Sequence, residues 1–215
     1  MIEIPRPRLV EELVELTRRG SVMVSGAPGI GKSWVLAQLV RRFKKESRRV
    51  MTLAAEDFQV SNLQQIYDSL KFTKPLPKLL AALPDPVLII DGLDALRGEA
   101  SQRAFRELIR EVTEQAPNAA IIGVGTNGDD RSVRQRLSDR YLTDAVFYNV
   151  HDDDNPHAEF PELMRELAEA CNQTIPAVLG PVEPLADVVA IEDIQRMEDM
   201  SDGFLRRIEE NHEND

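Results

Sequence analysis

Residues 26–33, Gly26-Ala27-Pro28-Gly29-Ile30-Gly31-Lys32-Ser33, decide the fold of this chain. They fill every fixed position of the pattern G-x-x-x-x-G-K-[ST], which describes the Walker A phosphate-binding loop. An apolar run at residues 21–25 precedes the loop, and a helical pattern begins at Trp34. The order is therefore strand, glycine-rich loop and helix, which is the context that such a loop requires.

The residue types of this loop suit a nucleoside triphosphate bound with Mg²⁺. Its glycines let the backbone approach phosphate oxygens, and the start of the following helix adds free N–H groups. We expect Lys32 to reach the β- and γ-phosphates and the Ser33 hydroxyl to bind Mg²⁺. The residues predicted to contact the nucleotide are Gly26, Ala27, Pro28, Gly29, Ile30, Gly31, Lys32, Ser33 and Trp34.

Asp91 is the second candidate site residue, because it ends the strongly apolar run at residues 86–90. Such a run is typical of a central strand in a parallel sheet. The carboxyl ends of these strands share one edge, so Asp91 is expected to lie near Ser33 and to hold the same Mg²⁺ as a Walker B aspartate. Asp94 either orients or deprotonates the attacking water or caps the turn after the strand. Lys32, Asp91 and Asp94 are the predicted catalytic residues.

Thr126 and Asn127 follow another apolar run, at residues 119–124. Their hydroxyl and amide groups are candidates to contact the γ-phosphate, and they serve equally well as residues of a turn. A group of arginines follows, each of them a candidate to offset charge in the transition state or an ordinary surface residue. These are Arg131, Arg134, Arg136 and Arg140.

Apolar runs alternate with helical patterns along the first 150 residues. The predicted strands are 21–25, 50–54, 86–91, 119–124 and 145–150, and the predicted helices are 9–16, 34–45, 61–70, 78–83, 101–115 and 131–137. Ser61 is the predicted N-cap of the third helix. This alternation predicts an α/β fold with a five-stranded parallel P-loop NTPase sheet flanked by helices. Residues 1–150 are the expected P-loop ATPase domain, with residues 1–20 as a lead-in helix.

The net charge of −11 is unevenly distributed. Residues 1–150 hold 22 basic and 19 acidic residues, a net charge of +3, whereas residues 151–215 hold 4 and 18, a net charge of −14. We expect 151–215 to form an acidic, mainly helical C-terminal extension. Its predicted helices are 161–171 and 191–200, with a strand at 187–191 as the alternative to the second, and a last helical turn or two at 204–208 precedes a frayed end from Glu209. Its charge disfavours nucleic acid as a partner of this segment.

Other clusters have ordinary explanations beside their functional ones. The basic cluster at residues 41–49 is either a solvated helix end or a patch for a partner. His151, His157 and the aspartates between them lack cysteine partners, so an acidic linker is favoured over a metal site. The N-terminus has no secretory pattern, Cys171 is the single cysteine, and no apolar run approaches about 20 residues. A cytoplasmic protein that does not enter a membrane is therefore expected.

The identity of the base follows by elimination. Residues 126–129 approach the guanine-recognition pattern [NT]-K-x-D, but Asn127 replaces its lysine. The companion motif D-x-x-G is also absent, because the stretch that begins at Asp91 ends in Asp94. ATP is therefore the expected nucleotide.

Three segments together resemble the ATPase module of STAND-type signalling NTPases within the AAA+-like P-loop group. They are the loop at 26–33, the run Val87–Asp94 with its D-G-x-D form, and Arg6-Pro7-Arg8-Leu9. The resemblance implies an ATP-dependent switch in which ATP binding drives self-assembly and hydrolysis resets it. It also implies that Arg6 lies near the adenine and that Asp94 is the second acidic residue of the motif. Ala95 replaces the acidic residue that often follows, which puts hydrolysis in question.

Three functions remain open from the sequence. The first is an ATP-hydrolysing switch that controls conformation or forms a homo-oligomer. The second is a nucleotide-binding interaction module that hydrolyses little and binds an unknown protein through residues 151–215. The third is a small-molecule kinase, for which no arginine-rich lid segment is evident.

Overall fold

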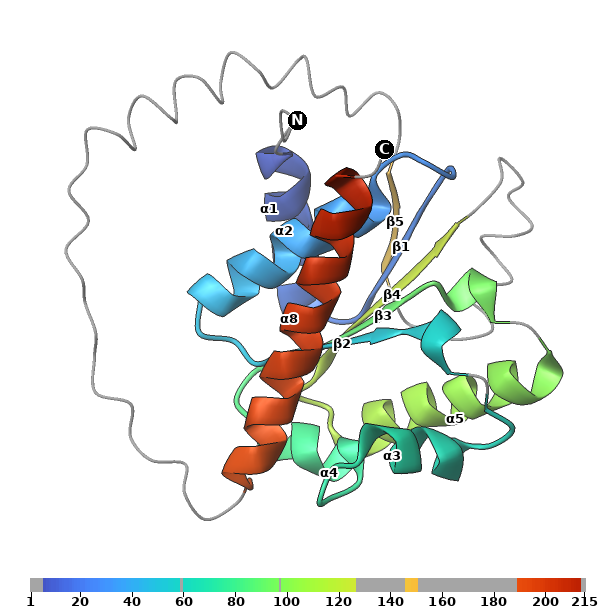
Figure 1. The fold of residues 1–215 in the computed structure, drawn as a ribbon. Helices are drawn as coiled ribbons and strands as arrows, with labels where there is room; N and C mark the ends of the chain where they lie inside the picture. The colour runs from blue at the N-terminus through green and yellow to red at the C-terminus, as the bar shows by residue number, and fades with distance from the viewer. Residues whose placement is uncertain (1–5, 59, 97, 127–145, 151–188, 214–215) are drawn as a thin grey trace.

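A computed structural model describes residues 6–58, 60–96, 98–126, 146–150 and 189–213 of the chain (Figure 1). Its sheet contains β1 (Val22–Gly26), β2 (Val50–Ala54), β3 (Val87–Asp91), β4 (Ala120–Thr126) and β5 (Val146–Val150). The strand order is β2-β3-β4-β1-β5, and all four neighbouring pairs are parallel. The predicted α/β class and the parallel sheet flanked by helices are confirmed.

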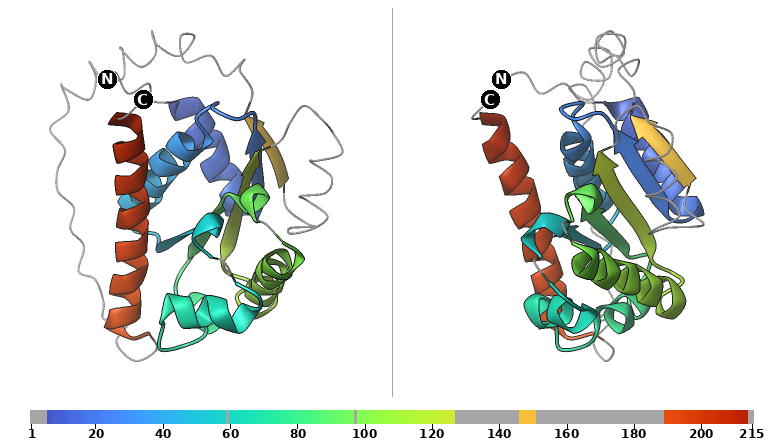
Figure 2. Two further views of the ribbon diagram at one scale, coloured as in Figure 1. Left: turned by 45° about the vertical axis from the view of Figure 1, so that its right-hand side comes forward. Right: turned by 90° about the vertical axis from the view of Figure 1, so that its right-hand side faces the viewer.

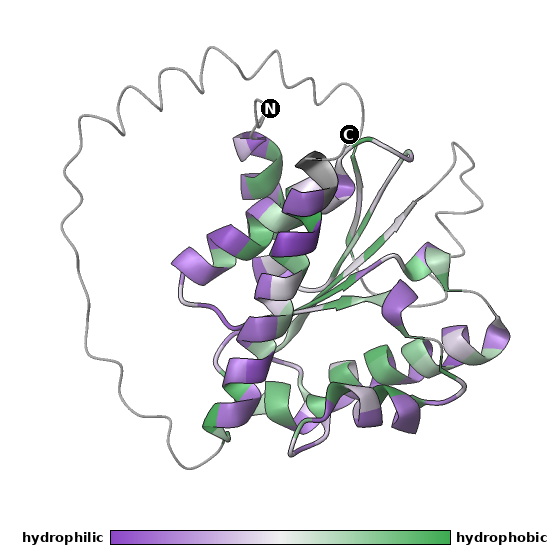
Figure 3. Ribbon diagram, viewed as in Figure 1, coloured by the Kyte–Doolittle hydropathy of each residue, from purple (hydrophilic) through white to green (hydrophobic). Residues whose placement is uncertain are grey.

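Helices cover both faces of this sheet. One core cluster joins the sheet to α1 (Pro7–Arg19) and α2 (Lys32–Lys45), and the other joins it to α3 (Leu63–Leu70), α4 (Leu76–Ala81) and α5 (Glu99–Gln115). Two 3-10 turns, η1 (Ala55–Asp57) and η2 (Leu93–Ala95), follow β2 and β3. Figure 3 shows the amphipathic colouring of the helices and the apolar colouring of the strands between them.

Strand β3 shows how the residue pattern produces this layering. Val87 and Ile89 belong to the core cluster with α1 and α2, whereas Leu88 and Ile90 belong to the cluster with α3, α4 and α5. All four side chains are fully buried, because alternate residues point to opposite faces and helices cover both. The continuous apolar run at 86–90 is therefore explained by its central position, and it leaves Asp91 at the carboxyl edge.

Most helix boundaries lie two or three residues from the predicted ones; α4, for example, spans Leu76–Ala81 instead of 78–83. Two further differences concern the cap of α3 and the extent of α8. The N-cap of α3 is Asn62, whose Oδ1 accepts a hydrogen bond from the backbone N–H of Gln65 at 3.1 Å, and not Ser61. The C-terminal helix α8 is one continuous helix from Ile191 to Glu213. The expectation of two separate helical segments, at 191–200 and 204–208, was wrong, because one helix runs through both and continues past Glu209, where a frayed end was expected. The alternative of a strand that includes Ile191 was also wrong.

Helix α8 runs along the edge strand β2, at the opposite end of the sheet from β5 (Figure 2). The Ser201 hydroxyl donates to the Val50 carbonyl at 2.7 Å, and the Thr52 hydroxyl donates to the Met200 carbonyl at 3.2 Å. An exposed edge strand invites unwanted pairing with other chains, and a covering helix prevents it. Helix α8 therefore protects the edge of the sheet.

Apolar side chains of α8 enter both core clusters. Met197 is buried with α3, α4 and α5, whereas Phe204 and Ile208 are buried with α1 and α2. Residues 191–213 are thus packed into the α/β core. The predicted boundary between residues 150 and 151 lies beside residues 151–188, which are outside the described part, and it stays a prediction.

Ion pairs surround this apolar contact and explain much of the basic cluster at residues 41–49. Arg49 pairs with Glu198 at 2.5 Å, Lys44 pairs with Asp202 at 2.6 Å, and Arg41 pairs with Glu209. Basic residues of the segment 41–49 are therefore neutralised by acidic residues of α8 within the same chain. Each pair is partly exposed, so it contributes little alone, and the set mainly orients α8 on the sheet.

Several predictions fall on residues outside the described ranges. They concern Asn127, the arginines at 131–140, the cluster at 151–157, the helices at 131–137 and 161–171, and Cys171. Among the described helices, none has the length and apolar character needed to span a membrane.

Candidate nucleotide-binding site

The loop at residues 26–33 joins the end of β1 to the start of α2. Gly29 and Gly31 have φ angles of 78° and 88°, which residues other than glycine rarely adopt. Gly26 is required for a different reason: a Cβ atom there would lie 3.0 Å from the Val150 carbonyl of β5 and 3.0 Å from a methyl group of Ile30. The first glycine of the motif thus permits close packing, and the other two permit the turn.

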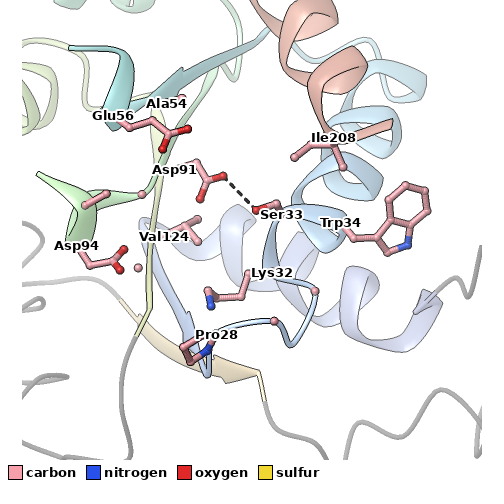
Figure 4. A pocket seen from close by; sticks show the side chains of 15 residues that line it. Pro28, Lys32, Ser33, Trp34, Ala54, Glu56, Asp91, Asp94, Val124 and Ile208 are labelled. Atoms are coloured by element: carbon pink, nitrogen blue, oxygen red, sulfur yellow. Dashed lines mark hydrogen bonds between the residues drawn. The ribbon is translucent and has the colours of Figure 1, made fainter. Parts of the chain in front are cut away.

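A pocket of about 520 Å³ lies over this loop at the carboxyl edge of the sheet (Figure 4). Side chains from the loop, from the ends of β2, β3 and β4 and from α8 line it. Its lining residues are Pro28, Gly29, Gly31, Lys32, Ser33, Trp34, Ala54, Glu56, Asp91, Gly92, Asp94, Ala95, Val124, Gly125 and Ile208. The carboxyl edge is where open α/β sheets bind ligands, so the location agrees with the sequence analysis.

Lys32 is the one cation among the described residues that line the pocket. Its Nζ donates hydrogen bonds to the carbonyls of Gly26 at 2.9 Å and Ala27 at 2.8 Å, which holds the ammonium group over the loop. Partial burial lowers the pKa of Lys32, and the negative charges of Asp94 and Asp91 oppose this shift. The side chain is therefore a charged group in a partly dry site, where its attraction for an anion is stronger than in water.

Asp91 and Ser33 meet at the centre of the pocket. The Ser33 hydroxyl donates to Asp91 Oδ2, and the two oxygens lie 3.4 Å apart. This spacing is close to the separation of about 3 Å between adjacent oxygens around an octahedral Mg²⁺ ion with bonds of about 2.1 Å. The two oxygen ligands thus fit a shared Mg²⁺ site.

The Asp91 carboxyl is largely buried, and this burial is the main reason why its pKa is raised. The negative charges of Asp94 and Glu56 raise the pKa further, whereas hydrogen bonds from the Gly92 backbone and from Ser33 oppose the rise. The native protein therefore binds a proton on Asp91 more tightly than the unfolded chain does. Asp91 therefore makes the protein less stable as the pH rises. The free energy of unfolding decreases from the ordinary aspartate pKa of 3.8 up to the raised pKa of Asp91 in the folded protein.

An Asp91→Asn variant is therefore expected to be more stable than the wild type near neutral pH when metal and nucleotide are absent. Asparagine keeps the shape of the side chain and removes the buried charge. The advantage should shrink as the pH falls toward 4, because the wild-type carboxyl then becomes protonated. Urea denaturation between about pH 4 and 8 measures the difference. A wild type that equals or exceeds the variant over this whole range would contradict the prediction.

Asp94 lies in the turn η2 and points into the pocket (Figure 4). Gly92 holds the cap position before this turn, and Gly98 holds the cap position before α5. Asp94 therefore occupies neither N-cap, which argues against the capping alternative. Ala95 also lines the pocket, so the position after Asp94 contributes no carboxylate.

The remaining predicted residues are placed less centrally. Trp34 lines the pocket, and the Arg41 guanidinium lies 5.3 Å from the centre of its ring. Arg6 is not among the lining residues; its backbone N–H donates to Gln38 Oε1 of α2 at 3.2 Å. Thr126 ends β4 opposite Gly26 of β1, but it is also not a lining residue, whereas Val124 and Gly125 are.

Glu56 and Ile208 also line the pocket, and neither was among the residues predicted from the sequence. Glu56 follows the end of β2, so the rule that places ligands at the carboxyl ends of strands was a signal that could have found it. No local signal marks Ile208, because it reaches the pocket from α8, over 50 residues beyond β5.

The parallel sheet, the Walker A loop and the carboxylate at the end of β3 define a P-loop nucleoside triphosphatase. More specifically, the chain belongs to the ATPase family associated with various cellular activities (AAA), whose family model matches residues 22–147. No curated protein matches the sequence.

Solved structures that are similar to this chain have low sequence identity. A DNA replication initiation factor is 16% identical, with 99% of this chain and 66% of that chain covered and a TM-score of 0.49. AMPPCP-bound DnaA from Aquifex aeolicus is 19% identical, with 87% and 57% covered and a TM-score of 0.49. The DnaC helicase loader is 18% identical, with 66% and 86% covered and a TM-score of 0.49. The chain thus spans less than two thirds of the first two proteins.

Proposed function

We propose that this chain binds ATP with Mg²⁺ and hydrolyses it, and that the bound nucleotide controls its conformation or self-assembly. The observation that carries the proposal is the convergence of Lys32, Ser33, Asp91 and Asp94 in one pocket over the glycine-rich loop. Membership in the AAA family of ATPases supports it. The assignment to the STAND subtype rests on the resemblance of three sequence segments, among which the D-G-x-D form of residues 91–94 narrows the P-loop class toward that subtype.

Each residue has a role in this proposal. The backbone of residues 26–33 holds the phosphates, with Lys32 at the β- and γ-phosphates and Ser33 and Asp91 at the metal. Asp94 orients the attacking water, and Trp34 and Ile208 lie at the side of the pocket formed by α2 and α8 (Figure 4). Arg6, Thr126 and Asn127 stay predictions as contacts to the nucleotide.

The charge of the pocket favours a metal–nucleotide complex over free ATP. Its described lining residues include three carboxylates, Glu56, Asp91 and Asp94, and one cation, Lys32. The phosphates of free ATP would therefore meet net repulsion, and a bound Mg²⁺ would neutralise much of it.

Two alternatives are distinguished by their products. A nucleotide-binding module would retain ATP without turnover, and the absence of an acid at Ala95 favours this reading. A small-molecule kinase would consume ATP only when an acceptor is present. A cytoplasmic location and binding of an unknown protein through residues 151–215 also stay predictions.

The first test measures release of inorganic phosphate from ATP by the full chain with and without Mg²⁺. Steady turnover that needs the metal and no added acceptor is expected. Retention of ATP without turnover would support the binding module, and turnover only with an acceptor would support the kinase.

Light scattering of the same protein, with ADP and with a non-hydrolysable ATP analogue, tests the role in assembly. The switch predicts a larger mass with the analogue than with ADP. Limited proteolysis of the same two states tests the role in conformation. Equal masses together with equal proteolysis patterns would contradict both forms of the switch, in assembly and in conformation.

A further inference from the structure

Glu56 is a carboxylate of the nucleotide pocket that the roles above do not use. It lies in η1, directly after β2, and the last residue of β2, Ala54, is the register partner of Asp91 on β3. The pairing of these adjacent strands therefore places Glu56 and Asp91 at the same part of the carboxyl edge of the sheet. Figure 4 shows both carboxylates pointing into the pocket, with Lys32 across from them.

The neighbouring acid in the same turn has a different environment. Asp57 forms an ion pair with Arg207 of α8 at 2.7 Å, which assigns it to the docking of that helix. Glu56 is exposed and has no ion pair with the described part of the chain. An exposed carboxylate that faces a pocket and has no structural partner is free to accept a proton.

Glu56 also has solvent on a second side. A neighbouring cavity of about 640 Å³, formed by η1, η2 and the start of α5, shares Glu56 and Ala95 with the nucleotide pocket. Water therefore has access to the Glu56 carboxylate from the side away from the phosphate-binding loop. Asp91 differs in this respect, because it is largely buried and bonded to Ser33.

We propose that Glu56 is the general base of ATP hydrolysis and supplies the carboxylate that is absent at position 95, where this chain has Ala95. This inference rests on the proposed function. The Glu56 carboxylate accepts a proton from water while the water oxygen forms a bond to the γ-phosphorus. The bond between the γ-phosphorus and the β–γ bridging oxygen breaks, and its electron pair stays on ADP. The proton then leaves Glu56 for solvent or phosphate. Asp94 acts beside it by orienting the water.

A Glu56→Gln variant of the full chain tests the proposal. Glutamine keeps the size and the hydrogen bonds of the side chain but cannot accept the proton at neutral pH. The kcat for ATP is expected to fall about 100- to 1000-fold, as for the loss of a general base. The Kd for a non-hydrolysable ATP analogue with Mg²⁺ should change by less than about threefold, because Glu56 repels the phosphates and does not hold them.

Two further variants separate catalysis from a structural effect. Asp57→Asn alters the adjacent carboxylate, which does not line the pocket, and should leave kcat unchanged. Glu56→Asp keeps a base with a shorter reach and should recover part of the activity that Glu56→Gln loses. Turnover by Glu56→Gln above about a third of the wild-type value, or a parallel loss in Asp57→Asn, would overturn the role of Glu56 alone. Absence of turnover in the wild type would overturn the proposed hydrolysis itself.

Discussion

Replacement of Lys32 by alanine is expected to lower the affinity for ATP with Mg²⁺ about 100-fold. Lys32 supplies the one positive side chain among the described lining residues, opposite Glu56, Asp91 and Asp94. Without it the pocket would present three carboxylates to an anionic ligand. A hydrogen bond to a charged group in a partly buried site contributes about 1.5–3 kcal/mol, which corresponds to a factor of about 10 to 150.

Titration calorimetry with a non-hydrolysable ATP analogue and Mg²⁺ measures this change. Lys45→Ala is the matched control, because Lys45 is an exposed lysine at the other end of the same helix. The control should bind like the wild type. Both variants should also unfold at the wild-type temperature, since within the described ranges Lys32 forms hydrogen bonds with no group other than two loop carbonyls. Affinity within about threefold of the wild type in Lys32→Ala would contradict the placement of phosphate at this loop.

Replacement of Phe204 by alanine is expected to lower the free energy of unfolding by about 3–5 kcal/mol. Phe204 is 3% exposed and packs in the core cluster of α1 and α2. The substitution leaves a cavity between α8 and the sheet and weakens the cover over β2. Chemical denaturation of the full chain measures the loss.

Arg206→Ala is the control for Phe204→Ala, because Arg206 is an exposed residue of the same helix. Its free energy of unfolding should stay within about 0.5 kcal/mol of the wild type. A loss below about 1 kcal/mol in Phe204→Ala would show that α8 is a separate extension, as the charge distribution along the sequence first indicated.

The packing of α8 also explains the acidic residues of this helix. Glu198, Asp202 and Glu209 neutralise basic residues of the segment 41–49, which would otherwise form a positive patch at the end of α2 and the start of β2. Ile208 from the same helix reaches the nucleotide pocket. The C-terminal helix thus contacts both the edge of the sheet and the site.

The features that were predicted correctly depend on local chemistry. Three glycines followed by Lys32 and Ser33 have few other uses, and the fully apolar run that ends at Asp91 has to be a central strand. The parallel sheet followed from the alternation of strands with helices. The N-cap of α3 was misassigned because Ser61 and Asn62 are both good caps, and only the backbone geometry distinguishes them.

The sequence by itself determined the phosphate-binding loop and the ends of the apolar runs that carry Asp91 and Asp94, because each depends on residues that are close along the chain. It also determined the parallel class of the sheet, because that follows from the alternation of strands with helices and needs no knowledge of which strands are neighbours. Only the tertiary structure decided that Glu56 stands beside Asp91, since the strands that precede them pair side by side although 34 residues separate Glu56 from Asp91 along the chain. It also decided the place of α8, whose contacts with β2 join residues about 150 positions apart. Contacts over such separations depend on shape and burial in the whole fold, and no short pattern of residues encodes them.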